Sequence, residues 1–208
     1  MNELAGQYWF PLYAYLRRQG HSPAAAEDLV QGFFTRLLEK EALSAVDRSK
    51  GKFRSFLLAS LKHFVSDEWD KRRAAKRGGA ASALSFDAME AEVCYAAEPV
   101  DSRTPEQVFE RRWAYAIIEQ VLTRLRDDYV ARGQSEIFAA LRHLLVGFSS
   151  GKRHAQIAGE LKMTEAAVKV AAHRLRRRYR ELLHEEIGQT VSDPALIDEE
   201  IRQLLESL

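Results

Sequence analysis

The chain has 208 residues, enough for one large or two small domains, and its 46% hydrophobic content is typical of a globular protein. Its net charge is only +1, from 31 Lys/Arg and 30 Asp/Glu, and its one cysteine, Cys94, excludes a disulfide framework and a cysteine-rich metal site. Neither a signal peptide nor an apolar run of membrane-spanning length is present, so we expect a cytoplasmic protein without a membrane partner.

Residues 4–19 form the first predicted helix, which is rich in aromatic side chains. Tyr8 and Leu12 share a face with Tyr15 or Leu16 at helical spacing. Pro11 is compatible with the first turn of the helix or with a kink. Gly20 is expected to end it.

The second predicted helix, 23–40, is strongly amphipathic. Ser22 is suited to the N-cap and Pro23 to the first helical position. Its apolar stripe consists of Leu29, Val30, Phe33, Phe34, Leu37 and Leu38. The opposite polar face carries Glu27, Asp28, Gln31, Thr35 and Glu39. That face indicates either plain solvation or a docking surface for a basic partner.

After a break at 44–52, residues 53–77 predict a long helix that ends at Gly78 and Gly79. Its last turns hold five cations within seven positions, namely Lys71, Arg72, Arg73, Lys76 and Arg77. This density exceeds what the helix dipole requires and favours contacts with phosphates. Trp69 has two interpretations of equal weight: an exposed ring that stacks on an unpaired base, or a core residue.

Residues 80–106 change character, with small residues, acids and two prolines, and we expect a linker with little regular structure there. Helices are then predicted over 105–129, with Trp113, Ile117, Val121 and Leu125 on one face, and over 135–145. A short amphipathic helix is predicted after Pro194, within an acidic tail. No strand and no internal repeat is indicated, so the chain is predicted to be all-α.

Residues 154–180 predict two helices joined by a tight turn, in which Thr164 caps the second helix. Lys162 occupies the position that often holds glycine in such turns, so its backbone must adopt a strained conformation. In the second helix one face is predicted to be buried, namely Val168, Ala171, Ala172, Leu175 and Tyr179, whereas the cationic side faces the other way. The cationic residues at helical spacing are Lys169, His173 and Arg177, followed by a dense run at Arg174, Arg176, Arg177, Arg178 and Arg180. This layout favours a helix-turn-helix that binds DNA over a solvated surface helix.

The charge alternates in blocks along the chain. Residues 48–80 carry 10 Lys/Arg against 3 Asp/Glu and residues 151–182 carry 9 against 3, whereas residues 85–110 and 183–208 each carry 1 against 7. Two basic blocks with acidic connectors indicate two separate contacts with nucleic acid. Phosphate-binding loops, nucleophile elbows and ligand-spaced histidines are absent from the sequence, so we predict no enzyme, no metal site and no cofactor.

Three stretches together resemble bacterial RNA polymerase sigma factors of the sigma-70 family, in the extracytoplasmic-function (ECF) group. They are YAYLRRQGHSPAAAEDLVQGFFTRLLE, FRSFLLASLKHFVSDEWDKRRAAKR and HAQIAGELKMTEAAVKVAAHRLRRRYRELL. The resemblance covers roughly residues 5–78 and 107–187, and the order of the motifs is more specific than any one of them. It implies a protein that binds core RNA polymerase and directs it to the −35 and −10 elements of promoter DNA.

The resemblance also implies domains and roles. Residues 1–79 correspond to sigma region 2, 80–106 to an acidic flexible linker, 107–188 to the region 4 helix-turn-helix domain, and 189–208 to an added acidic tail. The residues implied to dock on the clamp of the polymerase's largest subunit are Glu27, Asp28, Gln31 and Thr35. Those implied to bind the −10 element are Lys52, Arg54, Lys62, His63, Trp69, Arg72 and Arg73. Those implied to bind the −35 element are Thr164, Lys169, Val170, His173, Arg174 and Arg177.

The chain departs from the family pattern at several points. His63 replaces a frequent Asn, and Val170-Ala171 replace a frequent Ser-Arg pair. The tail lies outside the common core, and we expect it to fold back on the basic second domain or to bind a regulator. An anti-sigma factor or another regulator is a further candidate partner. The alternative function is a stand-alone helix-turn-helix transcriptional regulator with a helical partner-binding domain, which would need neither the acidic helix nor the first basic block.

Overall fold

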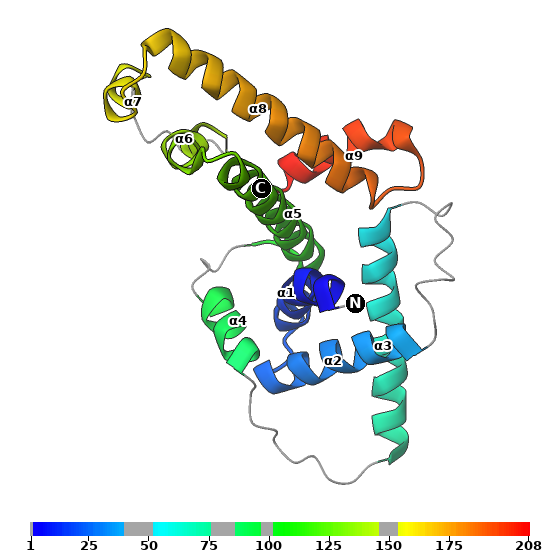
Figure 1. The fold of residues 1–208 in the computed structure, drawn as a ribbon. Coiled ribbons are helices and arrows are strands. Elements are labelled where there is room, and N and C mark those ends of the chain that lie inside the picture. The colour runs from blue at the N-terminus through cyan, green and yellow to red at the C-terminus, as the bar shows by residue number, and fades with distance from the viewer. Residues whose placement is uncertain (1, 40–51, 76–85, 97–101, 146–153) are drawn as a thin grey trace. The chain divides into compact units, whose positions relative to one another are not determined.

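The computed structural model describes residues 2–39, 52–75, 86–96, 102–145 and 154–208 (Figure 1). Across these ranges the regular elements are helical, apart from one isolated antiparallel bridge between Lys52 and Val191, which confirms the all-α prediction. The α-helices are α1 (Asn2–Arg18), α2 (Pro23–Glu39), α3 (Phe53–Ala75), α4 (Phe86–Ala96), α5 (Pro105–Ala131), α6 (Ser135–Leu141), α7 (His154–Glu160), α8 (Glu165–Gly188) and α9 (Ile197–Glu206). Two short 3₁₀ helices are η1 (Arg142–Leu144) and η2 (Pro194–Leu196).

The contacts divide the chain into two compact units. The first unit comprises Met1–Ala116 and Thr190–Leu208, and the second comprises Ile117–Gln189. The tail therefore belongs to the first unit. We expected it to fold back on the basic second domain or to bind a regulator; its described partners are instead residues at the start of α3, in the first unit.

An aromatic cluster forms the core of the first unit. Tyr8 of α1 stacks on Trp113 of α5 with ring centroids 4.2 Å apart and an interplanar angle of 9°, and Trp113 is only 1% exposed. Pro11 lies inside α1 rather than in its first turn, and Gly20, with φ of +92°, ends the segment as predicted. These apolar contacts fix α1 against the first turns of α5.

Helix α2 packs closely on α3 at Gly32. A Cβ atom at this position would lie 3.1 Å from Cζ of Phe64, so the absence of a side chain lets the helices approach. Arg36 forms a 2.8 Å ion pair with Asp67 across the same junction. The apolar stripe predicted for α2 faces this packing, and within it only Leu38 is exposed.

The prediction of little regular structure over 80–106 is wrong at residues 86–96, which form α4. Glu92 of α4 accepts hydrogen bonds from Tyr13 Oη at 2.7 Å and from Arg17 Nε at 2.8 Å, both on α1. The Arg17 guanidinium, by hydrogen bonding, holds the pKa of the Glu92 carboxyl below its ordinary value. A polar anchor therefore links the described side chains of α4 to α1.

In the second unit Ile117, Val121 and Leu125 of α5 are fully buried, as predicted from their spacing. Helices α7 and α8 are joined by a turn in which Lys162 has a φ of +53°, the left-handed conformation expected there. Thr164 is the N-cap of α8, and its Oγ1 accepts a hydrogen bond from the Ala167 backbone N–H at 3.2 Å.

Candidate nucleic-acid interface

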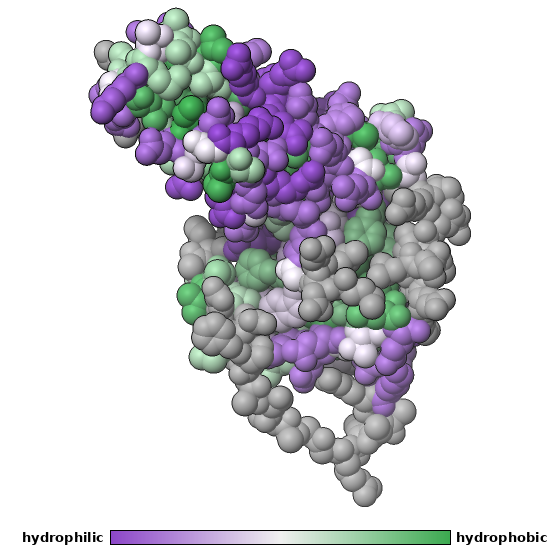
Figure 2. All heavy atoms as spheres, viewed as in Figure 1, coloured by the Kyte–Doolittle hydropathy of each residue, from purple (hydrophilic) through white to green (hydrophobic). Residues whose placement is uncertain are grey.

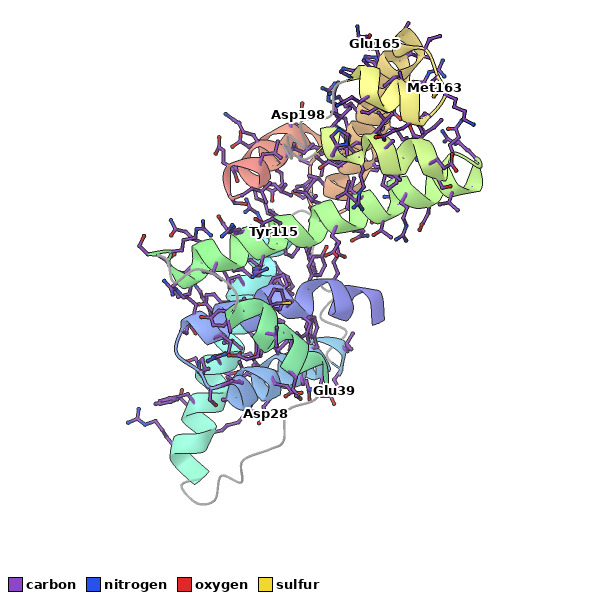
Figure 3. The ribbon with its side chains drawn as sticks, turned by 90° about the vertical axis from the view of Figure 1, so that its left-hand side faces the viewer. Asp28, Glu39, Tyr115, Met163, Glu165 and Asp198 are labelled. Carbon is purple, nitrogen blue, oxygen red and sulfur yellow. The ribbon has the colours of Figure 1, made fainter. Side chains whose placement is uncertain are left out.

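The polar face of α2 presents three of its four predicted docking residues to solvent. Asp28, Gln31 and Thr35 are exposed, and Asp28 lies on the outer side of the helix (Figure 3). Glu27 differs: it is only 6% exposed and accepts a 3.0 Å hydrogen bond from Gln31 Nε2. The face therefore offers exposed carboxylates at Asp28 and Glu39, whereas the carboxylate of Glu27 is turned inward and supports Gln31.

The outer face of α3 carries exposed Lys62, His63, Trp69 and Arg73. Trp69 is 62% exposed, which decides between its two interpretations in favour of an exposed ring. The side chain of Arg72 lies outside the described part of the structure, as do Lys76, Arg77 and the predicted stop at Gly78 and Gly79. Four of the seven predicted −10 residues thus lie on one accessible helix face.

Trp69 borders an open hollow of about 580 Å³. Its lining includes Tyr15, Lys62 and Glu106. The Lys62 ammonium lies 2.8 Å from Glu106 Oε1 and 5.8 Å from the centroid of the Tyr15 ring. Hydrogen bonding between the two charged groups raises the pKa of Lys62 and lowers that of Glu106. An aromatic ring beside a cation is the combination that captures an unpaired base and its phosphate.

The remaining two predicted −10 residues, Lys52 and Arg54, are covered by acidic and amide side chains. Arg54 is only 7% exposed, so it is not an accessible DNA contact in this conformation. Arg54 Nε lies 2.5 Å from Glu200 Oε1 and Arg54 Nη1 lies 3.2 Å from Glu110 Oε1. Lys52 Nζ lies 2.7 Å from Glu200 Oε2. The sequence contained the signal for this contact, the acidic block at the C-terminus, but its partner was misassigned.

Helix α8 exposes the predicted −35 residues and buries the opposite side. Lys169, Val170, His173, Arg174 and Arg177 are exposed, as is the N-cap Thr164, whereas Val168, Ala172 and Leu175 are buried. Lys169 pairs with Glu165 at 3.1 Å and Arg177 with Glu181 at 2.9 Å, each one turn away on the same helix. Such exposed pairs are weak and leave the cations accessible to a phosphate.

Apolar and cationic side chains divide the surface of α8. Val170 is 50% exposed and borders a hollow that also includes Ile137, Met163, Ala166 and Arg174. Figure 2 shows hydrophilic residues gathered over the middle of α8, next to a paler end formed by α7 and the first turns of α8. The start of the helix thus combines exposed Ala166 and Val170 with the Glu165–Lys169 pair, and its middle is densely charged.

Arg178 does not belong to the outward cationic run. Its Nε donates to Asp128 Oδ2 of α5 at 2.8 Å, and its Nη1 lies 3.4 Å from Glu185 Oε1. The hydrogen bond to Asp128 raises the pKa of Arg178. Arg124 of α5 pairs with Glu185 and Glu186 in the same way, at 2.8 and 3.1 Å. Arg178 therefore holds α8 on α5, a role that spacing along one helix could not show.

Among the described residues, no group of three or more His, Cys, Asp or Glu side chains is placed to hold a metal ion. Nor does any described helix combine the length and apolar character that a membrane crossing needs.

Comparison with known proteins identifies the first three helices. Residues 6–75 match the family model of Sigma-70 region 2, a span that covers most of α1, α2 and α3. No curated protein and no solved structure matches the chain. The matched span contains the whole predicted docking face of α2 and all seven residues predicted to contact the −10 element.

Proposed function

We propose that this chain, which belongs to the sigma-70 family of transcription initiation factors, is a sigma factor of the ECF group that directs core RNA polymerase to promoters through −35 and −10 elements. One observation carries the proposal. Within the span matched by region 2, α2 exposes a polar, acidic face and α3 exposes a basic, aromatic one. A single helix pair thus offers one surface suited to a basic protein partner and another suited to nucleic acid.

On the polymerase side, Asp28, Gln31 and Thr35 form the docking surface, and the partner is the clamp of the largest subunit. Exposed carboxylate and amide groups give such a contact its orientation and speed of association. Glu27 contributes indirectly, because its carboxylate fixes the Gln31 amide through the 3.0 Å hydrogen bond. The complex forms in the cytoplasm, where core polymerase works.

On the −10 side, Lys62, His63 and Arg73 contact an opened strand, and Trp69 stacks on an unpaired base. The 62% exposure of Trp69 supports this role, because a ring in the core could not reach a base. Cations hold the strand through its phosphates and carry no sequence information, so base discrimination falls to His63, Trp69 and the hollow beside them.

On the −35 side, α8 enters the major groove with its N-terminal half. Lys169 and His173 reach base edges there, Val170 supplies an apolar contact, and Arg174 and Arg177 bind phosphates. The small or apolar side chains of Ala166 and Val170 let the helix approach the duplex closely. The cations in the middle of the helix hold it against the phosphate backbone of the DNA.

Binding of core RNA polymerase tests the polymerase half of the proposal. Purified chain should co-elute with bacterial core polymerase, and Asp28→Ala should weaken the complex about tenfold, as expected for loss of a charged contact at an interface. Asp70→Ala, which removes an exposed carboxylate from α3, is the matched control and should bind like the wild type. If the wild-type chain shows no affinity for core polymerase, the chain is not a sigma factor, and a stand-alone regulator becomes the better account.

A further inference from the structure

The C-terminal segment, residues 190–208, lies across the start of α3. The backbone N–H of Phe53 donates to the carbonyl oxygen of Thr190 at 2.9 Å, and Lys52 and Val191 form an antiparallel bridge. Ile197 and Leu204 of α9 are buried, at 6% and 3% exposure. Asp198, by contrast, points to solvent at the start of α9 (Figure 3). We call residues 190–208 the strap.

Glu200 is the centre of this contact. It is only 2% exposed, and its carboxylate lies 2.5 Å from Arg54 Nε and 2.7 Å from Lys52 Nζ. Gln203, one turn later, accepts a 2.8 Å hydrogen bond from Arg54 Nη2 and a 2.5 Å hydrogen bond from Lys52 Nζ. One face of α9 thus occupies both cations at the start of α3 with oxygen acceptors.

A carboxylate between an arginine and a lysine offers these cations the same kind of acceptor as a backbone phosphate of DNA. Both groups are anions that accept charge-assisted hydrogen bonds from guanidinium and ammonium donors. Because Arg54 is 7% exposed, no phosphate can reach its guanidinium while Glu200 is in place. Occupation of these two cations by the strap and by DNA is therefore mutually exclusive.

The strap is also held by few apolar contacts, so it can dissociate from the start of α3. Leu205 and Leu208 are 51% and 37% exposed, so α9 relies on two buried apolar side chains and on its ion pairs. A buried ion pair contributes little net stability, since the attraction between the charges is largely offset by their desolvation. A polyanion that offers the same cations several phosphates can therefore compete with it.

We propose that the strap is an autoinhibitory segment that withholds Lys52 and Arg54 from DNA until it is displaced. The inference rests on the proposed function only in the assignment of these two cations to DNA. It adds a regulation of that site: the free protein has a low affinity for nucleic acid, which rises when the strap leaves.

The first test measures binding of a fluorescent single-stranded oligonucleotide of mixed sequence by anisotropy across a salt series. Glu200→Gln removes the charge that holds the strap, so we expect binding about three- to tenfold tighter than wild type at low salt. With two more phosphates contacted, the slope of log K against log salt should steepen by up to about 1.4. Asp198→Asn, which removes an exposed carboxylate from the same helix, is the control and should follow the wild type.

The second test needs no substitution. Hydrogen exchange of the peptides that cover 190–208 and of the Phe53 amide is compared in the free wild-type protein and with saturating oligonucleotide. Displacement predicts faster exchange in both places when DNA is added. Equal affinity of the three proteins for the oligonucleotide, at whatever level, or unchanged exchange in saturating DNA, would overturn the proposal.

Neither test uses RNA polymerase, so the two proposals can fail separately. Loss of core binding would refute the sigma factor and leave a strap that competes with nucleic acid. If the chain binds core polymerase but DNA does not displace the strap, only the autoinhibition proposal is refuted.

Discussion

The backbone conformation of Lys162 follows from the tight turn of the helix-turn-helix. Its φ of +53° lies in the left-handed region, which costs a residue with a side chain roughly 1–2 kcal/mol relative to the right-handed one. The chain accepts this cost because the turn must reverse direction between Glu160 and Thr164. The same residue was singled out from sequence alone, because it stands where glycine is common.

We predict that Lys162→Gly stabilises the second unit by about 0.5 kcal/mol, because relief of strain outweighs the greater freedom of glycine in the unfolded chain. Lys169→Gly, inside α8, should instead destabilise it by about 1 kcal/mol. Hydrogen exchange of α7 and α8 in the two variants measures both changes. The unit contains no tryptophan, so fluorescence of the whole chain would not report on it. Destabilisation by both glycines would contradict the strain assigned to this turn.

Predictability differed between residues for a physical reason. Positions set by periodicity within one helix, such as Val168, Leu175 and Trp113, were predicted correctly, because a helix fixes which side chains share a face. Arg54 and Arg178 resembled their exposed neighbours in the sequence, but each has a carboxylate partner on another helix. Charge and spacing cannot show which cation of a basic run turns toward another element.

Helix α4 is the helix that was not predicted from the sequence. It lies in an acidic stretch that also contains small residues and Pro99, a composition that favours a linker. Its described contacts with α1 include one carboxylate, Glu92, that reaches Tyr13 and Arg17. Helix α9, in contrast, has its apolar residues on one face and was predicted from that pattern.

The docking of α4 should depend on pH. The pKa of Glu92 is lowered in the folded protein, mainly by the hydrogen bond from Arg17. Its contribution is therefore present above the ordinary carboxyl pKa and is lost as pH falls through the folded pKa. A pH-insensitive dye on the exposed Cys94, the only cysteine, reports the mobility of α4 by anisotropy. We expect mobility to increase between neutral pH and about pH 3.

The matched variants sharpen this prediction. Glu92→Gln should leave the dye mobile at every pH, because the amide cannot form the ion pair with Arg17. Glu39→Gln, at an exposed acid of α2, should keep the wild-type profile. A wild-type profile in Glu92→Gln would show that another group anchors α4.

At the scale of the whole molecule, helices that are far apart in the sequence have different proposed binding partners. In the function we propose, α2 contacts the polymerase, α3 the −10 element and α8 the −35 element. In the free chain, acids of α5 and α9 also pair with cations of α3: Glu106 pairs with Lys62, and Glu200 with Arg54. The alternating charge blocks are explained in part by these pairs, which a net charge of +1 conceals.

This division predicts a variant that separates the two activities. Lys169→Ala should leave the affinity for core polymerase unchanged and weaken binding of the holoenzyme to duplex promoter DNA about tenfold, as for one lost base contact. Arg126→Ala, which removes an exposed cation from α5 of the same unit, is the control and should bind the promoter like wild type. A parallel loss of core binding in Lys169→Ala would contradict the separation of roles.

Run-off transcription tests the central claim most directly. Core RNA polymerase is incubated with fragments of the source genome, with and without the purified chain, and the 5′ ends of the transcripts are mapped. We predict transcripts that require the chain and begin at a fixed distance downstream of a shared pair of sequence elements. A chain that binds duplex DNA tightly by itself, yet never supports initiation by core polymerase, would contradict the account.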